Sequence, residues 1–163
     1  MEKPKKYISK DAALAKLRHF CAYQERCHDE VRTKLIELGI YGNDRENIIA
    51  VLIEDNFLSE QRFAEAYVGG KFRIKRWGKI RILQGLKLRH ISEYCIRKAM
   101  EIIDNVTYLN TLQEVLEEKQ RELAISRKEI SIFERNQRMA QYALRKGFES
   151  GLVWDAIREH FKN

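Results

Sequence analysis

The chain has 163 residues, of which 44% are hydrophobic and 34% are charged, and its formal net charge is +7. That length suits one ordinary domain or a few very small ones, each folding around a core without the help of disulfides or metals. The composition excludes a disordered tail, and because no apolar run approaches the roughly 18 residues that a bilayer span requires, it also excludes a membrane-spanning protein.

A single proline, Pro4, leaves residues 5–163 without anything that forbids a helical hydrogen bond, so we predict an all-α fold. The first predicted helix covers about 10–23 and carries an apolar face that includes Cys21. The second starts near His28 and stops at Gly39, a residue suited to the left-handed turn after a helix. The third begins at 42–46, where Asn43 and Glu46 have capping-box spacing.

The same pattern of three helices then recurs. Ser59 is the predicted cap of a fourth helix, which weakens near Gly69 and Gly70 and ends by 77–78. We predict a fifth helix whose apolar face holds Ile80, Leu83 and Leu86, and a sixth that starts at Ser92. A shift of 51 positions aligns Val31, Leu35 and Ile40 with Ile82, Leu86 and Ile91, which indicates an internal repeat.

A third copy follows, although its first helix has two possible starts. Thr111 and Glu114 have capping-box spacing, while Tyr108 and Leu109 favour an earlier start. The eighth helix ends at 147–148, which matches 39–40 at a shift of 108, and a ninth helix completes the chain. We therefore expect three tandem three-helix repeats, at 1–56, 57–105 and 106–163, which form an elongated, curved molecule. The alternative is one compact nine-helix globule.

One segment carries the whole excess of positive charge. Residues 66–92 contain no Asp or Glu but have eight Lys and Arg; without these eight, 23 basic residues stand against 24 acidic ones. Such a block attracts a polyanion or an acidic protein surface, whereas the structural alternative is a solvated helix face. Trp77 in this segment could stack on bases, while we assign Phe63, Tyr67 and Phe72 to the core.

Motifs for catalysis and cofactor binding are missing from the sequence. The glycines match no nucleotide-binding loop, and the spacing of His19, Cys21, Cys27 and His28 is not that of a zinc finger. We predict a protein that is not an enzyme and binds no cofactor or metal. The N-terminus lacks the apolar stretch of a secretory signal, and three cysteines form no disulfide framework, so we expect a cytoplasmic location.

The order and spacing of these repeats resemble the RecX family, the bacterial regulators of the RecA recombinase. In the first copy the resemblance rests on Ala13-Leu14, Leu17, Glu30-Val31, Lys34-Leu35 and Gly39-Ile40. It continues through Phe57-Leu58-Ser59-Glu60, Arg62-Phe63-Ala64, Tyr67-Val68, Arg73, Gly78, Arg81-Ile82, Leu86 and Ile91, and ends in 141–148, QYALRKGF. Three places depart from the family pattern: His90 replaces the glycine that ends the helix, Gly85 weakens that helix, and Ser59-Glu60 stands where Asp is common.

The resemblance implies three tandem three-helix repeats and a protein that binds RecA, above all its filament on DNA. It further implies that the protein lies in the helical groove of the filament and lowers ATPase, coprotease and strand-exchange activity. Weak direct binding to DNA is a further expectation, with no membrane contact and a monomeric state. The expected contact residues are Lys71, Arg73, Lys75, Arg76, Lys79, Arg81 and Arg89, with Arg145 and Lys146 as a second patch.

Two alternatives from other classes stay open at this point. The first is a free-standing helical DNA- or RNA-binding protein, in which the fifth helix enters a groove as a recognition helix. The second is a structural scaffold without a role linked to DNA. Both accommodate the same basic segment, so sequence alone does not separate them from a regulator of recombination.

Overall fold

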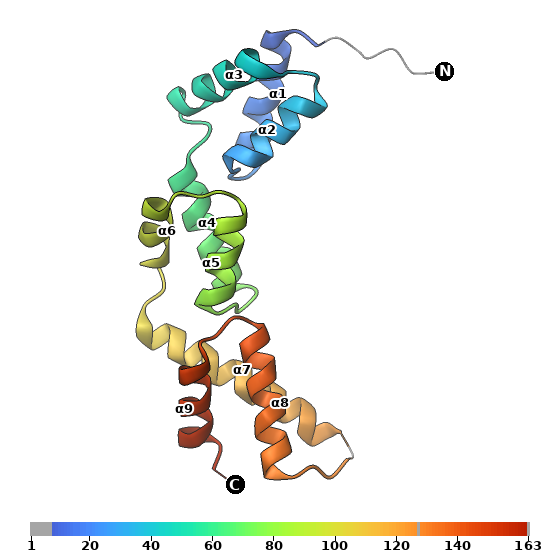
Figure 1. The fold of residues 1–163 in the computed structure, drawn as a ribbon, viewed down its shortest axis with the longest axis vertical. Coiled ribbons are helices and arrows are strands. Elements are labelled where there is room, and N and C mark those ends of the chain that lie inside the picture. Colours follow the sequence, from blue (N-terminus) through green and yellow to red (C-terminus); the bar gives the residue numbers. More distant parts are fainter. Residues whose placement is uncertain (1–7, 127, 163) are drawn as a thin grey trace, which may run out of the picture.

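The computed structural model describes residues 8–126 and 128–162, and across these ranges the chain forms helices and no strands. This confirms the predicted all-α fold. The helices are α1 (Lys10–Tyr23), α2 (His28–Glu37), α3 (Gly42–Glu54), α4 (Glu60–Arg73), α5 (Lys79–Leu88), α6 (Glu93–Met100), α7 (Asn105–Ile125), α8 (Ile132–Arg145) and α9 (Ser150–His160). Figure 1 shows them as an elongated, bowed stack. Their contacts divide them into a first group, α1–α3, a second, α4–α6, and a third, α7–α9.

Short polar side chains begin most of these helices. Ser59 and Ser92 accept hydrogen bonds from the amides of Arg62 and Cys95, as their positions in the sequence predicted. The prediction for Asn43 is wrong, because α3 starts at Gly42 with Tyr41 as its N-cap, two residues before the predicted cap. Glu46 binds Arg32 instead of closing a capping box. The later start of α7 is also wrong: Asp104 caps it, and Thr111 lies inside the helix, where its hydroxyl donates to the Thr107 carbonyl.

The second helix of each group ends in the same turn. The amides of Ile40, Ile91 and Phe148 donate to carbonyls five residues back, at 2.9, 3.2 and 3.2 Å, and the residue before each has a positive φ. Two of these preceding residues are glycines, but the third is His90, with a φ of 56°. An L-residue in this conformation is strained. Histidine in place of glycine therefore adds backbone strain to this turn but leaves its hydrogen bonds intact.

Two details of the second group differ from the sequence interpretation. Helix α4 continues through Gly69 and Gly70 to Arg73 instead of weakening there. Ile80 is 43% exposed, because the buried face of α5 is formed by Ile82, Gly85 and Leu86. A side chain at Gly85 would overlap the Tyr67 hydroxyl, so this glycine allows α4 and α5 to approach closely.

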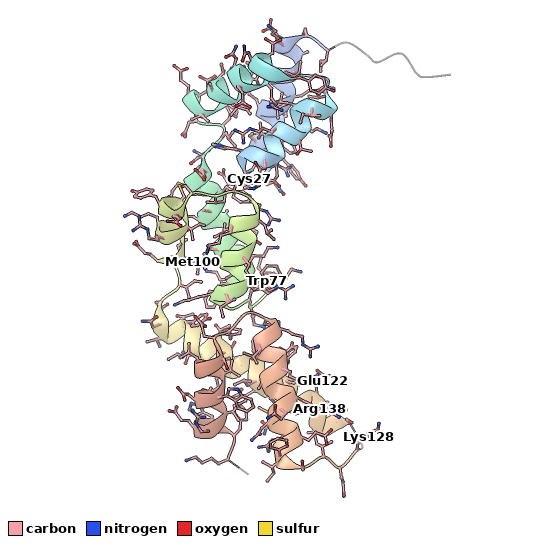
Figure 2. The ribbon with its side chains drawn as sticks, in the orientation of Figure 1. Cys27, Trp77, Met100, Glu122, Lys128 and Arg138 are labelled. Atoms are coloured by element: carbon pink, nitrogen blue, oxygen red, sulfur yellow. The ribbon has the colours of Figure 1, made fainter. Side chains whose placement is uncertain are left out.

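The buried hydrophobic residues of the three groups form two separate cores. The first contains residues of α1–α3 together with Leu58, and the second is continuous through α4–α9. Cys27 follows α1 in the chain but packs into the second core, and Figure 2 shows it at the end of the first group that faces the second. The described contacts between these groups also include polar pairs: Arg62 with Glu25 at 3.0 Å, and His90 with Asp29 at 2.5 Å.

Candidate interaction surface

The second and third groups meet through backbone atoms. The amides of Gly78 and Ile80, at the start of α5, donate to the carbonyls of Lys146 and Gly147, just past the end of α8, at 2.8 and 3.0 Å. The carbonyl end of one helix thus satisfies the amide end of another, and the two helix dipoles align head to tail. A Cβ at Gly78 would overlap the carbonyl group of Gly147, so the contact requires glycine at this position.

Tyr108 secures this junction from α7. Its hydroxyl accepts a 3.0 Å hydrogen bond from the Lys79 amide and donates one to the Glu149 carboxylate. Its ring lies 5.2 Å from that of Phe148 and 6.0 Å from that of Phe72, between centroids. One side chain therefore joins the start of α5 to the turn after α8 and packs in the core that they share.

Basic residues of the predicted surface surround the junction, and several lie on aromatic rings. The guanidinium of Arg81 lies 4.0 Å from the centroid of Trp77, and the ammonium of Lys71 lies 4.8 Å from the same centroid. Trp77, labelled in Figure 2 near the lower end of the second group, is partly buried against the shared core. Cation–π contacts of this kind hold long basic side chains in place without neutralising their charge.

The second predicted patch joins the first at this junction. The ammonium of Lys146 donates to the Lys75 carbonyl at 3.2 Å, and a guanidinium nitrogen of Arg81 donates to the Arg145 carbonyl at 3.4 Å. Burial lowers the pKa of Lys146, and the nearby guanidiniums of Arg76 and Arg81 lower it further against the opposing effect of Glu118. Residues about 70 positions apart in sequence thus form one cationic surface.

The other predicted contact residues lie farther from this centre. Arg73 is exposed at the end of α4, while the Lys79 ammonium lies over the Tyr108 ring at 4.5 Å. Arg89 lies just past the end of α5; its guanidinium lies over the Tyr67 ring and donates to the Gly85 carbonyl at 2.9 Å. Arg76 alone among the nine forms an ion pair within the described residues, with Glu118 of α7.

Sequence reasoning missed part of this surface, because it lies on α7 and outside the basic segment. The ammonium of Lys119 lies 5.4 Å from the centroid of the Tyr142 ring and is paired with Glu122 at 2.7 Å. The ammonium of Lys146 lies at the same distance from that ring. Nothing in the local pattern of α7 distinguishes Lys119 from an ordinary solvated lysine. Its place beside the surface follows from the packing of α7 on α8.

No group of three or more His, Cys, Asp or Glu among residues 8–126 and 128–162 could hold a metal ion. Cys21 is buried in the first core, as predicted, and burial raises the pKa of the Cys21 and Cys27 thiols. Within the same ranges, no helix combines the length and apolarity needed to cross a membrane.

Tyr108 makes the stability of the junction depend on pH. Burial, then the hydrogen bond to Glu149, raises the pKa of this phenol. The folded state therefore favours the neutral phenol, and the stabilisation is complete below the unfolded pKa of about 10 and is lost as the pH rises above it. We expect the free energy of unfolding to fall by up to about 1.4 kcal/mol per pH unit there.

Tyr108→Phe removes the titrating group. The free energy of unfolding of this variant is therefore expected to lack the part of the alkaline decrease that Tyr108 causes. Urea titrations of both proteins between about pH 8 and 11 give the comparison. Because the two proteins have the same lysines and the same other tyrosines, the difference between the two curves isolates Tyr108. Parallel curves would contradict the assignment.

The chain resembles known proteins in both sequence and structure. The family model described as "RecX, second three-helix domain" matches residues 59–100, which include α4–α6. "Regulatory protein RecX" of Clostridium acetobutylicum is 26% identical over 134 residues, 81% of this chain and 61% of the relative. The protein of the same name from Neisseria gonorrhoeae is 27% identical over 139 residues, 83% and 82% of the two chains.

The fold gives a consistent comparison. The crystal structure of RecX from Lactobacillus salivarius superposes with a TM-score of 0.80, at 21% identity, over 92% of this chain and 95% of that one. A second crystal structure, of a regulatory protein RecX, gives a TM-score of 0.81 at 20% identity. At these identities the likeness establishes the fold. The matches to relatives from Clostridium acetobutylicum and Clostridium perfringens each span 61% of the relative's length.

Proposed function

The chain belongs to the RecX family, and from that premise we propose that it is a regulatory protein which binds the RecA recombinase and its filament on DNA. We further propose that binding lowers the ATPase, coprotease and strand-exchange activities of RecA. In this proposal the protein acts by contact and catalyses no reaction. Its working surface is the set of nine cations predicted from the sequence, which we call the basic surface.

Unneutralised charge is the observation that carries this proposal. In the first group, Lys10, Arg18 and Arg32 are all paired with carboxylates. Of the nine residues of the basic surface, by contrast, only Arg76 has an acidic partner among the described residues. Cations left without partners in the isolated chain favour an anionic partner outside it.

The shape of the molecule supports a filament as that partner. Three groups stacked along one axis (Figure 1) present a long surface. The second and third groups share a core, which fixes the positions of their cations relative to one another. We propose that such a surface contacts more than one subunit of a helical assembly, since contacts to several subunits increase affinity by raising the effective concentration. We propose that the bound protein holds neighbouring RecA subunits in one arrangement and so slows their turnover.

The first test is the rate of ATP hydrolysis by RecA of the same organism on single-stranded DNA, with this protein titrated from far below equimolar upwards. We expect inhibition well below equimolar, because one bound molecule affects many subunits of a filament. Circular dichroism of the added protein shows that it is folded. Unchanged hydrolysis up to an equimolar amount would overturn the proposal.

A charge-reversal variant tests the basic surface itself. Arg73→Glu, Lys75→Glu and Arg145→Glu replace three exposed cations that have no ion pair among the described residues. Because each reversal replaces an attraction by a repulsion, we expect half-inhibition to need at least about ten times more protein, roughly 1.4 kcal/mol in binding. The readout is the same ATPase titration.

The matched control places the same charge change elsewhere. Arg97→Glu, Lys98→Glu and Arg121→Glu also replace three exposed cations, on α6 and α7. If inhibition depended only on net charge, this control would lose as much activity as the first variant. Equal losses in both variants would remove the basic surface from the proposal.

The alternative of a recognition helix is less compatible with the packing of α5. Recognition helices place residues of their N-terminal turn against base edges. Here that turn is in contact with the backbone after α8 through the amides of Gly78 and Ile80. Sequence-selective binding to duplex DNA or to RNA in the absence of RecA would nevertheless favour this alternative, and it stays a prediction to be tested.

A further inference from the structure

We propose that the first group is a hinged arm, which turns relative to α4–α9 at Leu58 and Ser59 and is held in the observed orientation by polar contacts of Arg62. The inference goes beyond the proposed function, because it concerns a movement within the chain and requires no partner. It rests on the different construction of the two junctions that join the three groups.

The junction between the second and third groups is rigid, whereas the one between the first and second is not. The second and third groups share one core and are joined by the backbone hydrogen bonds of Gly78 and Ile80. The first group has a core of its own, and among the described residues no backbone hydrogen bond joins it to α4–α9. The close packing of α1, α2 and α3 also lies within that group. Movement of one group as a rigid body is therefore favoured at the first junction.

The change from one rigid body to the next occurs between two adjacent residues. Leu58 is buried in the first core, and its amide donates to the Leu52 carbonyl of α3 at 3.1 Å. Ser59 caps α4 and has an extended backbone, with φ −141° and ψ 116°. Rotation about ψ of Leu58 and φ of Ser59 breaks no backbone hydrogen bond among the described residues. We call these two residues the hinge.

An open groove beside the hinge leaves space for the movement. It has a volume of about 550 Å³ and lies between Phe20 and Asp29 of the first group and Leu88 and Arg89 of the second. At the second junction, by contrast, one added methyl group would overlap backbone atoms. The first junction is therefore not close-packed on this side, and the first group can turn there without a collision.

Side chains on either side of the hinge hold the observed orientation. Nε of Arg62, at the start of α4, donates to the Glu25 carboxylate at 3.0 Å. Its terminal nitrogens donate to the side-chain and backbone oxygens of Asn56 at 2.6 and 2.8 Å. His90 and Asp29 form a second pair across the junction at 2.5 Å. We call these two sets of contacts the latch.

The latch opposes release only weakly. The side chains of Arg62 and Glu25 are 35% and 33% exposed, and that of His90 is 79% exposed, so solvent screens both pairs. The second carboxylate oxygen of Glu25, Oε2, is buried and accepts no hydrogen bond from the described residues. A buried carboxylate oxygen without a donor disfavours the closed orientation, and turning of the arm hydrates it.

Cys27 gives the movement a natural reporter. It belongs to the first group but is fully buried in the core of α4–α9, so turning of the arm withdraws it and exposes its thiol. Cys21 is buried in the separate core of the first group and becomes exposed only when that core unfolds. The reactivities of these two thiols therefore distinguish release of the arm from unfolding of the arm.

The first test measures the rate at which Cys27 reacts with a maleimide at constant pH. Cys21→Ala with Cys95→Ala leaves Cys27 as the only thiol of the chain. In this background, Arg62→Gln removes the ion pair with Glu25 and the bonds to Asn56. We expect Cys27 to react about ten times faster, because the open fraction increases. An unchanged rate would overturn the latch.

Two controls accompany this measurement. Arg138→Gln removes an arginine from an ion pair on α8, in the third group (Figure 2), and is expected to leave the rate at Cys27 unchanged. In a second background, Cys27→Ala with Cys95→Ala, Arg62→Gln is expected to leave the rate at Cys21 unchanged. Equal acceleration at Cys21 and Cys27 would mean that the first group unfolds instead of turning, and would overturn the hinge.

Distances between spin labels test the movement directly. The labels are attached to Lys16→Cys and Lys98→Cys, at exposed positions of α1 and α6, after the three natural cysteines are replaced by Ala. We expect a broad distribution of distances for this pair, which Arg62→Gln broadens further. Labels at Lys98 and Arg158, on α6 and α9, are expected to give a narrow distribution in both proteins. Equally narrow distributions for the two pairs would overturn the hinge.

These measurements contain no RecA, so their outcome is separate from that of the proposed function. If both label pairs give narrow distributions while the protein inhibits RecA, the hinge is wrong and the proposed function stands. If Cys27 and the labels behave as expected while RecA hydrolyses ATP unhindered, the proposed function fails and the hinge stands.

Discussion

Gly78→Ala is expected to lower the free energy of unfolding by about 3 kcal/mol, because the added methyl group has no space. The Cβ would overlap the carbonyl carbon and oxygen of Gly147 and the nitrogen of Phe148, all of them backbone atoms that cannot rotate away. To relieve the overlap, α5 must move from the end of α8 and weaken the hydrogen bonds from Gly78 and Ile80. Chemical unfolding followed by circular dichroism measures the loss.

Gly70→Ala provides a control with the same chemical change. Gly70 lies inside α4, and a Cβ there would meet nothing within 4 Å. Alanine is favoured over glycine inside a helix, so this variant is expected to gain about 0.5 to 1 kcal/mol. The two substitutions should therefore act in opposite directions. A loss of similar size in both would show that the contact with Gly147 is not what makes glycine necessary at position 78.

Local patterns predicted the helices well because caps and apolar periodicity are local properties. Ser59 and Ser92 begin helices where the sequence placed them, and α1 has the predicted bounds of 10–23. Asn43 and Thr111 show the limit of such patterns: each matches a capping signature, but an earlier residue begins the helix. The repeat limits at 56–57 and 105–106 stay predictions, although α1–α3, α4–α6 and α7–α9 each pack among themselves.

The candidate surface was only partly predictable. The acid-free segment identified most of its cations, since charge composition is read directly from sequence. Lys146 reaches the Lys75 carbonyl because two turns that contain glycines, 69 positions apart in the sequence, approach each other. No local pattern encodes that approach. The sequence marked Gly78 as a helix boundary and Gly147 as a repeat position. Their contact appears only when the second and third groups are packed together.

Phe148→Ala is expected to cost about 4 kcal/mol and to weaken the second and third groups together. Phe148 is fully buried, and its ring packs on Tyr108 within the core that extends from α4 to α9. Removing the ring leaves a cavity beside the junction, and the close-packed surroundings collapse into it only partially. Amide hydrogen exchange is therefore expected to accelerate across 60–160.

Ile40→Ala tests whether the first group is independent of that shared core. Ile40 occupies the same turn position in the first copy, but it packs in the separate core of α1–α3. We expect a loss of about 3 kcal/mol that accelerates exchange in 10–58 and leaves α4–α9 protected, because few packed residues cross between the two cores. Equal acceleration along the whole chain would mean that contacts such as Cys27 and the Arg62–Glu25 pair couple the groups into one cooperative unit.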